Sequence, residues 1–98
     1  MLLSMHHERV QLDHKEADGY LIPAGPFNIV SIHTDVGMVG CGAFDVMALD
    51  RFEYPAARIS GVATVADLLE GQIKEANESA LGLGVKPGMT GRAALAFL

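Results

Sequence analysis

Apolar and polar residues alternate in several short stretches of this chain, and glycine and proline separate these stretches. Between residues 8 and 14, Val10 and Leu12 share one face while Arg, Gln and Asp side chains occupy the other, which is typical of a half-buried edge strand. Segment 15–26 contains two glycines and two prolines. We therefore expect a connection there that holds no long regular structure.

An apolar hairpin is predicted next. Residues 27–33 are rich in β-branched and apolar side chains on both faces, as expected of an interior strand. Turn residues at 34–37 separate them from a second apolar run, 37–44, so the two strands should pair antiparallel. Cys41 then lies in a central strand.

A helix and another strand predict a crossover. Asp45 can cap a short helix over 46–52, whose apolar side chains would face inward. Residues 56–62 then predict a further strand, which Pro55 separates from the helix. This order suggests that the chain returns to the same sheet by a crossover connection.

The last third of the chain predicts helices, and its middle part allows two interpretations. Thr64 and Asp67 have the spacing of a capping box, so a helix should begin there. Periodicity alone predicts one helix over 64–83, although Gly71 in its middle costs about 1 kcal/mol relative to alanine. A final helix is expected over 91–98.

The composition fits one small α+β domain with a mixed sheet. The chain has 98 residues, half of them apolar, and 11 glycines, enough for one core of small and branched side chains. The formal net charge of −5 disfavours nucleic acid and membrane surfaces as partners. The first residues do not form a signal peptide core, and one cysteine allows no internal disulfide, so we expect a cytoplasmic protein. Small domains of this kind often gain stability by association, which predicts a homo-oligomer.

Cys41 is the best candidate for chemistry, because the glycines on both sides leave its thiol little shielded. It would act as a nucleophile or redox thiol if a cation or a helix N-terminus stabilised its thiolate. Packing as a small buried apolar side chain is the simpler interpretation. His33 should face Met38 or Val39 across the hairpin, so a Cys-His pair is not supported.

Two glycine-containing segments are candidate sites for a small anionic ligand. Their residues are Gly40, Gly42, Asp45, Thr90, Gly91 and Arg92. The first three precede a helix, but their order does not match a dinucleotide fingerprint and the P-loop lysine is absent, so tight strand packing is the alternative. The last three open the final helix with a hydroxyl, backbone N–H groups and a guanidinium, which suit a carboxylate or phosphate. An ordinary helix cap, with the arginine paired to a local acid, is the alternative there.

The histidines near the N-terminus do not predict a metal site. His6 and His7 would point to opposite faces of a strand, and His14 has no cysteine or acid at a matching spacing. We therefore expect no metal and no cofactor. Three methionines are predicted to fill the core: Met38, Met47 and Met89.

Three blocks of the sequence resemble, in order and spacing, the YunC-like family, a small domain of unknown function in bacteria and archaea. These blocks are Gly37–Gly42, Ser60–Leu69 and Gly88–Leu95. The resemblance covers residues 19–98 and implies a compact, self-associating α+β core within one domain, 1–98. Residues 1–18 would then form a variable N-terminal strand and connection.

The resemblance also decides between the two interpretations of the helical region. It implies an extended stretch over 71–76 and a new helix cap at Asn77, hence helices over 64–70 and 77–83. Ala93 stands where the family more often has an acidic residue, which removes a capping box from the final helix.

The resemblance brings no established reaction. From the missing acid-base constellation we expect a non-catalytic binding or self-assembly module. The alternative is a small cysteine-dependent enzyme or an anionic-ligand sensor that uses Cys41 and Arg92.

Overall fold

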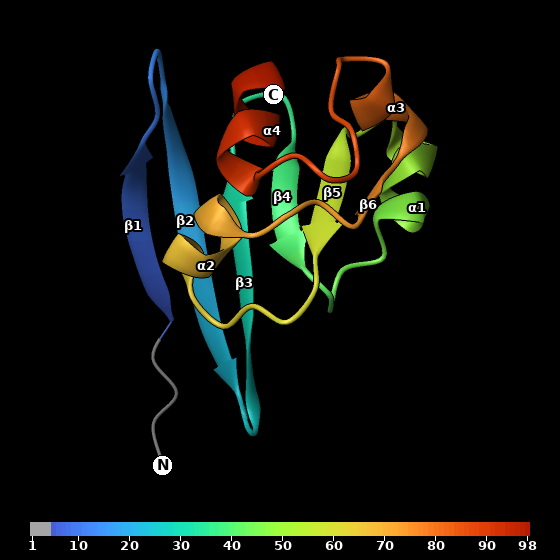
Figure 1. Cartoon of the computed structure of the whole chain (residues 1–98). Coiled ribbons are helices and arrows are strands. Elements are labelled where there is room, and N and C mark those ends of the chain that lie inside the picture. Colours follow the sequence, from blue (N-terminus) through green and yellow to red (C-terminus); the bar gives the residue numbers. More distant parts are fainter. Residues whose placement is uncertain (1–4) are drawn as a thin grey trace.

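The computed structural model describes residues 5–98. Its six strands form one sheet in which they lie side by side in the order of the sequence (Figure 1). They are β1 (His6–Gln11), β2 (Glu16–Ala24), β3 (Phe27–His33), β4 (Met38–Cys41), β5 (Ala56–Ile59) and β6 (Glu75–Ala76). Neighbouring strands are antiparallel, except that β4 and β5 are parallel. The predicted hairpin, crossover and mixed sheet of an α+β domain are therefore confirmed.

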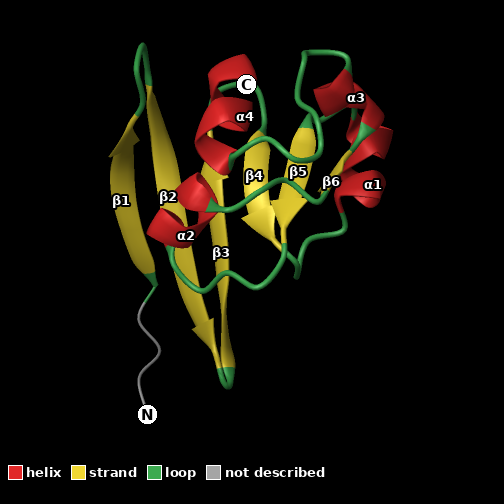
Figure 2. Cartoon of the chain, viewed as in Figure 1, coloured by secondary structure: helices red, strands yellow, loops and turns green. Residues whose placement is uncertain are grey.

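The helices are short, and side chains at their first turns fix where they begin (Figure 2). They are α1 (Val46–Leu49) with its 3-10 continuation η1 (Asp50–Phe52), α2 (Val65–Glu70), α3 (Glu78–Leu81) and α4 (Gly91–Phe97). Asp45 caps α1, and Thr64 forms the predicted capping box of α2 with Asp67. Thr90 caps α4 through the backbone N–H of Ala93, without a second arm of a box.

The sheet has a different cover on each face. Figure 1 shows α2 and α4 across one face, where Leu68 and Leu95 belong to the main core together with Ile32 of β3. Adjacent residues of a strand point to opposite faces, so Met38 faces away from this core and packs with Val46 of α1 instead. Each of the two parallel strands is thus covered on both sides.

The segment 15–26 is a correction to the sequence prediction, because most of it forms β2, the longest strand. Gly19 is no turn residue: a Cβ there would lie 3.0 Å from a methyl group of Val65, so glycine lets α2 approach the sheet. Among the described residues, the pairing of β2 with β1 ends at Leu21, so Pro23 pairs only with β3. A proline fits there because one side of the strand needs no backbone donor. Only Gly25, with φ of 76°, and the next residue form the hairpin turn.

Three smaller predictions need correction as well. The strand predicted over 37–44 ends at Cys41, and the strand predicted over 56–62 ends at Ile59, two residues before Gly61 with φ of 73°. Met47 is 49% exposed on α1 and does not fill the core. The apolar character of Met47 does not by itself show which side of this short helix faces the core.

The break that the resemblance implied between α2 and α3 is confirmed. Gly71 is extended, and a Cβ on it would lie 2.7 Å from Ile59, so a helical side chain has no room there. Asn77 caps α3 as expected, and its side chain is fully buried. This side chain joins α1, β5 and α3 through four hydrogen bonds.

Candidate functional site

The chain leaves the two parallel strands in opposite directions. After Cys41, at the end of β4, it passes to α1 on one face of the sheet. After Ile59, at the end of β5, it passes to α2 on the other face. Such a divergence leaves a crevice outside the carboxyl ends of the strands, which is the usual ligand position in open sheets that contain parallel strands.

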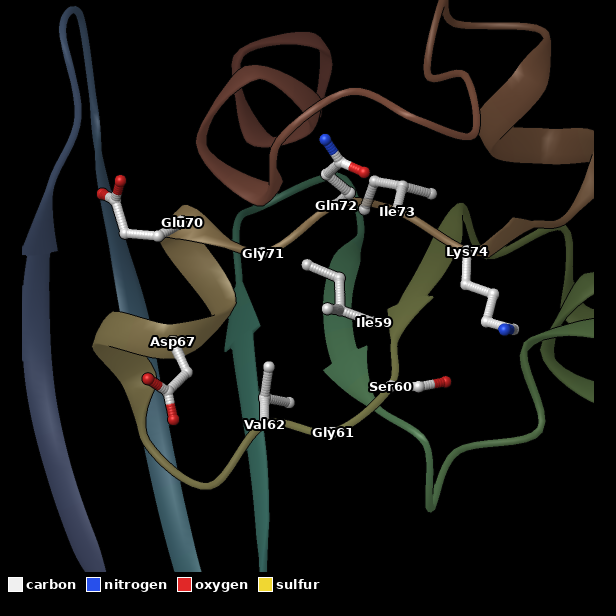
Figure 3. Close-up of a pocket in the computed structure, with 10 residues that line it drawn as sticks. All are labelled: Ile59, Ser60, Gly61, Val62, Asp67, Glu70, Gly71, Gln72, Ile73 and Lys74. Atoms are coloured by element: carbon white, nitrogen blue, oxygen red, sulfur yellow. The ribbon is translucent and has the colours of Figure 1, made fainter.

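An open crevice of about 730 Å³ lies beside the end of β5, between the loop that leaves this strand and the segment that follows α2. Figure 3 shows the ten lining residues, with Ile59 and Val62 towards the middle. They are Ile59, Ser60, Gly61, Val62, Asp67, Glu70, Gly71, Gln72, Ile73 and Lys74. The apolar residues of the crevice are Ile59, Val62 and Ile73, and the charged side chains of Asp67, Glu70 and Lys74 are exposed on its rim.

The charges on the rim are divided between two walls (Figure 3). Asp67 and Glu70 come from α2, whereas Lys74 comes from the segment that leads to β6. Asp67 accepts hydrogen bonds from the backbone N–H groups of Ala63 and Thr64, and these contacts hold the pKa of its carboxyl below the ordinary value. The carboxylate is therefore ionised at neutral pH and fixed in place.

Glu70 and Lys74 are the more available charges. The Glu70 side chain is 77% exposed, and its Oε2 lies 3.6 Å from Nη2 of Arg92, a loose ion pair on the surface. Lys74 is exposed, and its backbone N–H donates to the carbonyl oxygen of Arg58, which holds the second wall against β5.

Gly42 borders the same end of the sheet, while Cys41 does not open into the crevice. A Cβ on Gly42 would lie 4.0 Å from Oγ of Ser60. The Ser60 hydroxyl in turn accepts a hydrogen bond of 3.2 Å from Nη1 of Arg58. Cys41 is 4% exposed within the main core and is absent from the lining of the crevice.

His33 does not approach the cysteine. It pairs across the hairpin with Met38, as predicted, and its ring nitrogens lie 3.2 Å from the Tyr54 hydroxyl and 3.0 Å from Oγ of Ser31. Burial lowers the pKa of His33, so the ring is neutral at physiological pH. The structure therefore gives the Cys41 thiol no histidine partner.

The remaining candidate residues have internal roles, and the structure does not gather them into one site. A Cβ on Gly40 would lie 2.5 Å from the Phe44 ring, and a Cβ on Gly91 would collide with the carbonyl oxygen of Leu68. The Asp45 and Thr90 side chains accept capping hydrogen bonds. Asp45 and Thr90 are exposed as well, but their side chains are engaged in these caps, whereas the 49% exposed Arg92 has only its loose pair with Glu70.

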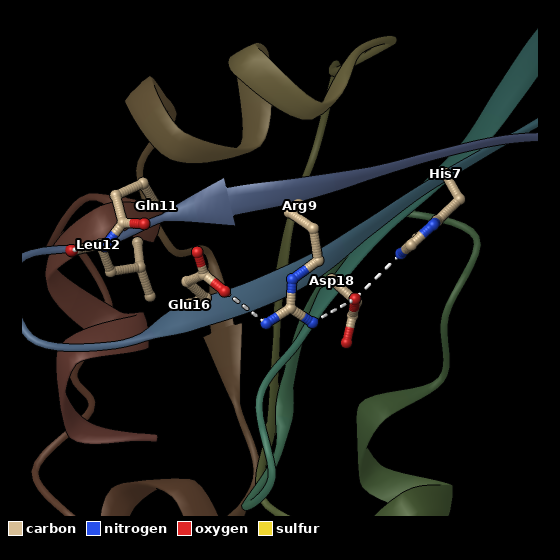
Figure 4. Close-up of polar contacts among 6 residues, drawn as sticks. All are labelled: His7, Arg9, Gln11, Leu12, Glu16 and Asp18. Atoms are coloured by element: carbon tan, nitrogen blue, oxygen red, sulfur yellow. Dashed lines mark hydrogen bonds and ion pairs between the residues drawn. The ribbon is translucent and has the colours of Figure 1, made fainter.

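Of the N-terminal histidines, His7 belongs to a cross-strand network of β1 and β2 (Figure 4). Arg9 lies between two acids, with Nη2 2.7 Å from Glu16 and Nη1 2.9 Å from Asp18. His7 also reaches Asp18 at 2.9 Å, and the bonds from His7 and Arg9 lower the pKa of this carboxyl. The contacts of His7 and Arg9 thus tie the edge strand to the sheet, whereas His6 points to the opposite face and pairs with Glu8 of the same strand.

Residues 5–98 contain neither a cluster of metal ligands nor a membrane-spanning helix. No three His, Cys, Asp or Glu side chains in this part of the chain gather as metal ligands would. No helix in the same residues has both the length and the apolar character that a membrane crossing requires.

Sequence reasoning missed the crevice, because its walls come from two separate segments, 59–62 and 67–74. A signal was present in Ser60-Gly61, two small residues inside the strand predicted over 56–62, where glycine often marks a break or a close approach. Their importance depends on the parallel pairing of β4 and β5, which sets the two departing connections on opposite faces.

These features define a small α+β domain with a mixed six-stranded sheet and a crevice beside its parallel strand pair. The chain belongs to the DUF1805 family, a domain of unknown function whose sequence profile matches residues 40–98. It is 36% identical over 72 residues to the uncharacterized protein YunC of Bacillus subtilis (strain 168). The aligned stretch covers 69% of this chain and 71% of that protein. The predicted YunC-like membership is confirmed.

A solved structure shares the fold. The crystal structure of a protein of unknown function, TA1206 from Thermoplasma acidophilum, matches 98% of this chain and 94% of that chain with a TM-score of 0.91. The two sequences are 22% identical, so the likeness concerns the fold alone.

Proposed function

We propose that this chain is a non-catalytic binding module whose ligand occupies the crevice beside the parallel strands. The observation that carries the proposal is a hollow of about 730 Å³ beside the carboxyl end of β5, one of the two parallel strands after which the chain passes to opposite faces of the sheet. Ligands in other open sheets with parallel strands lie at this position, and the support is an analogy with those folds. The ten lining residues include no histidine or cysteine, so the crevice holds neither an imidazole base nor a thiol nucleophile.

The lining suits a small zwitterionic molecule with an apolar body. Val62, which is half-buried, would contact the apolar part. Glu70 on α2 would attract an ammonium group, and Lys74 on the other wall would attract a carboxylate. Free amino acids and short peptides have this distribution of charge.

An NMR titration tests this proposal. Zwitterionic amino acids and dipeptides are added to the ¹⁵N-labelled chain, and we expect shifts of amides in segments 59–62 and 70–74. Ser60→Trp should fill the crevice and remove the response, whereas Asp35→Trp, in the exposed turn at the other end of β4, should leave it unchanged. Shifts confined to other segments, or a response that survives Ser60→Trp, would contradict the proposal.

Self-assembly is the second candidate function, and exposed apolar side chains favour it. Phe52 is 78% exposed on η1, and Leu81 at the end of α3 is 40% exposed. A bond of 2.7 Å from the Ser79 hydroxyl to Asp50 holds these two elements together, so their apolar residues belong to one end of the molecule. We infer a homo-oligomer that buries this end. Sedimentation of the wild type as a monomer at micromolar concentration, or as an oligomer that Phe52→Asp does not weaken, would contradict this inference.

The alternative of a cysteine-dependent enzyme or sensor gains no support from the geometry. Cys41 is buried in the core, and Arg92 lines a different part of the surface. A cytoplasmic location remains part of the proposal, supported by the single cysteine, which allows no internal disulfide.

A further inference from the structure

A small, well-enclosed pocket of about 90 Å³ lies between the turn that joins β1 to β2 and the helix α4. It shares no lining residue with the crevice. Its walls are Leu12, Asp13, His14, Lys15, Arg92 and Ala96. The pocket therefore brings basic side chains from the two ends of the sequence to one place.

Lys15 forms one side of this pocket and is held there by the fold. Its backbone carbonyl accepts a hydrogen bond of 2.8 Å from the N–H of Leu12, which closes the turn. Its Nζ donates to the carbonyl oxygen of Leu98 at 3.0 Å, across to the end of α4. An ammonium group has three donors, so two remain for a ligand after this bond.

Arg92 forms the opposite side and is loosely paired. Its guanidinium lies 3.6 Å from Glu70, whereas the guanidinium groups of Arg9 and Arg58 each have a carboxylate oxygen at 2.7 Å. A long ion pair between exposed side chains contributes little, so the Arg92 fork can turn to a ligand at small cost.

We propose that this pocket binds a small oxyanion, a phosphate group. The chain has only seven Lys and Arg residues and a net charge of −5, yet two of the seven and a histidine line a space the size of one such group. Arg and Lys with free donors form strong, charge-assisted hydrogen bonds to phosphate oxygens. The apolar Leu12 and Ala96 reduce competition from water on the remaining walls.

Asp13 also lines the pocket, and its negative charge opposes an anion. This gives the proposal a test with effects in two directions. Inorganic phosphate is titrated into the ¹⁵N-labelled chain at constant ionic strength, and we expect shifts of amides in segments 13–15 and 92–96. Arg92→Gln should weaken phosphate binding about tenfold, the loss of one charge-assisted contact. Asp13→Asn should strengthen it about threefold, since a repulsive charge near the surface is removed.

Arg51→Gln is the matched control, because it removes the same charge from an exposed position on η1, outside the lining of the pocket. It should change phosphate affinity less than twofold. An equal loss of phosphate affinity in Arg92→Gln and Arg51→Gln would overturn the proposal, because phosphate would then be attracted to positive charge in general and not to this pocket. The absence of phosphate-dependent shifts at these segments, or weaker binding in Asp13→Asn, would overturn it too. The crevice proposal stands or falls separately, because its test uses zwitterionic ligands and the Ser60→Trp variant.

Discussion

Asn77→Asp replaces a buried amide by a carboxyl group of nearly the same shape, and it should destabilise the fold in a way that depends on pH. The Asn77 amide donates to the carbonyl oxygens of Val46 at 2.9 Å and Tyr54 at 2.8 Å. Its oxygen accepts from the N–H groups of Ala56 and Ala80 at 3.1 and 3.0 Å. Aspartate keeps the acceptor but loses both donors, and it sets an ionisable oxygen against two carbonyl oxygens.

The magnitude follows from the burial of residue 77, whose exposed fraction is 0%. An isolated charge is too costly in such a place, so the carboxyl must take up a proton on folding. In the unfolded chain an aspartate has a pKa of about 3.9, and proton uptake at pH 7 therefore costs about 4 kcal/mol. One donor stays missing even in the protonated acid, which adds about 1–3 kcal/mol. The total is comparable with the whole stability of a small domain.

The assay is urea unfolding followed by circular dichroism, for wild type and Asn77→Asp, between pH 4.5 and 7.5. The folded pKa of the new carboxyl is raised above its unfolded value, so the loss of stability should be smallest at acidic pH. It should grow by about 1.4 kcal/mol per pH unit towards neutrality. If the variant is unfolded at pH 7, acidification should refold it.

Thr64→Ala is the control, because Thr64 is also a helix cap but is exposed to solvent. It should cost about 1 kcal/mol at every pH tested, apart from a small change with the ionisation of its box partner. A pH-independent loss in Asn77→Asp, or a loss no larger than that of Thr64→Ala, would refute the reasoning about the buried amide.

Three further predictions concern residues of the core and the sheet. Burial lowers the pKa of His33, so protonation favours the unfolded chain and the free energy of unfolding should fall as pH drops below about 6.5. Unfolding curves measured over a pH series should show this fall for the wild type, and His33→Gln should lack the part of it that His33 causes. Gly91→Ala should destabilise the fold by about 2 kcal/mol or more, because the new Cβ would collide with the Leu68 carbonyl oxygen. Gly42→Ala is the control: its Cβ would lie 4.0 Å from the nearest atom, so the denaturation midpoint should stay within the error of measurement. Cys41 is 4% exposed, so iodoacetamide should label the native chain at least about a hundredfold more slowly than the urea-unfolded chain, and rapid native labelling would contradict its burial.

Local patterns predicted those parts of the fold that depend on neighbouring residues. The caps at Asp45, Thr64 and Thr90 were predicted correctly because a cap is a contact between residues three positions apart. The turn before β4 was predicted for the same reason.

Predictions failed where a residue's role depends on distant partners. Gly19 and Pro23 indicate a loop on local grounds, yet both lie in β2. Glycine is needed at 19 because α2 approaches the sheet there, and proline is tolerated at 23 because the pairing with β1 ends at Leu21. Periodicity favoured a continuous helix through Gly71, and only contact with Ile59 shows why the helix stops. The pocket that joins Lys15 to Arg92 has no trace in local sequence, since the turn and α4 meet only in the folded chain.

The arrangement of the sheet has a consequence for how the chain folds. Each strand pairs with its predecessor in the chain, so every strand finds its partner already made as synthesis proceeds. The cover is acquired in a different order: α4, which brings Ala94 and Leu95 onto the core, is the last of these elements. Until α4 is complete, part of the apolar face of the sheet stays open to water and to other chains. The nascent domain is thus most prone to aggregation just before its final helix docks.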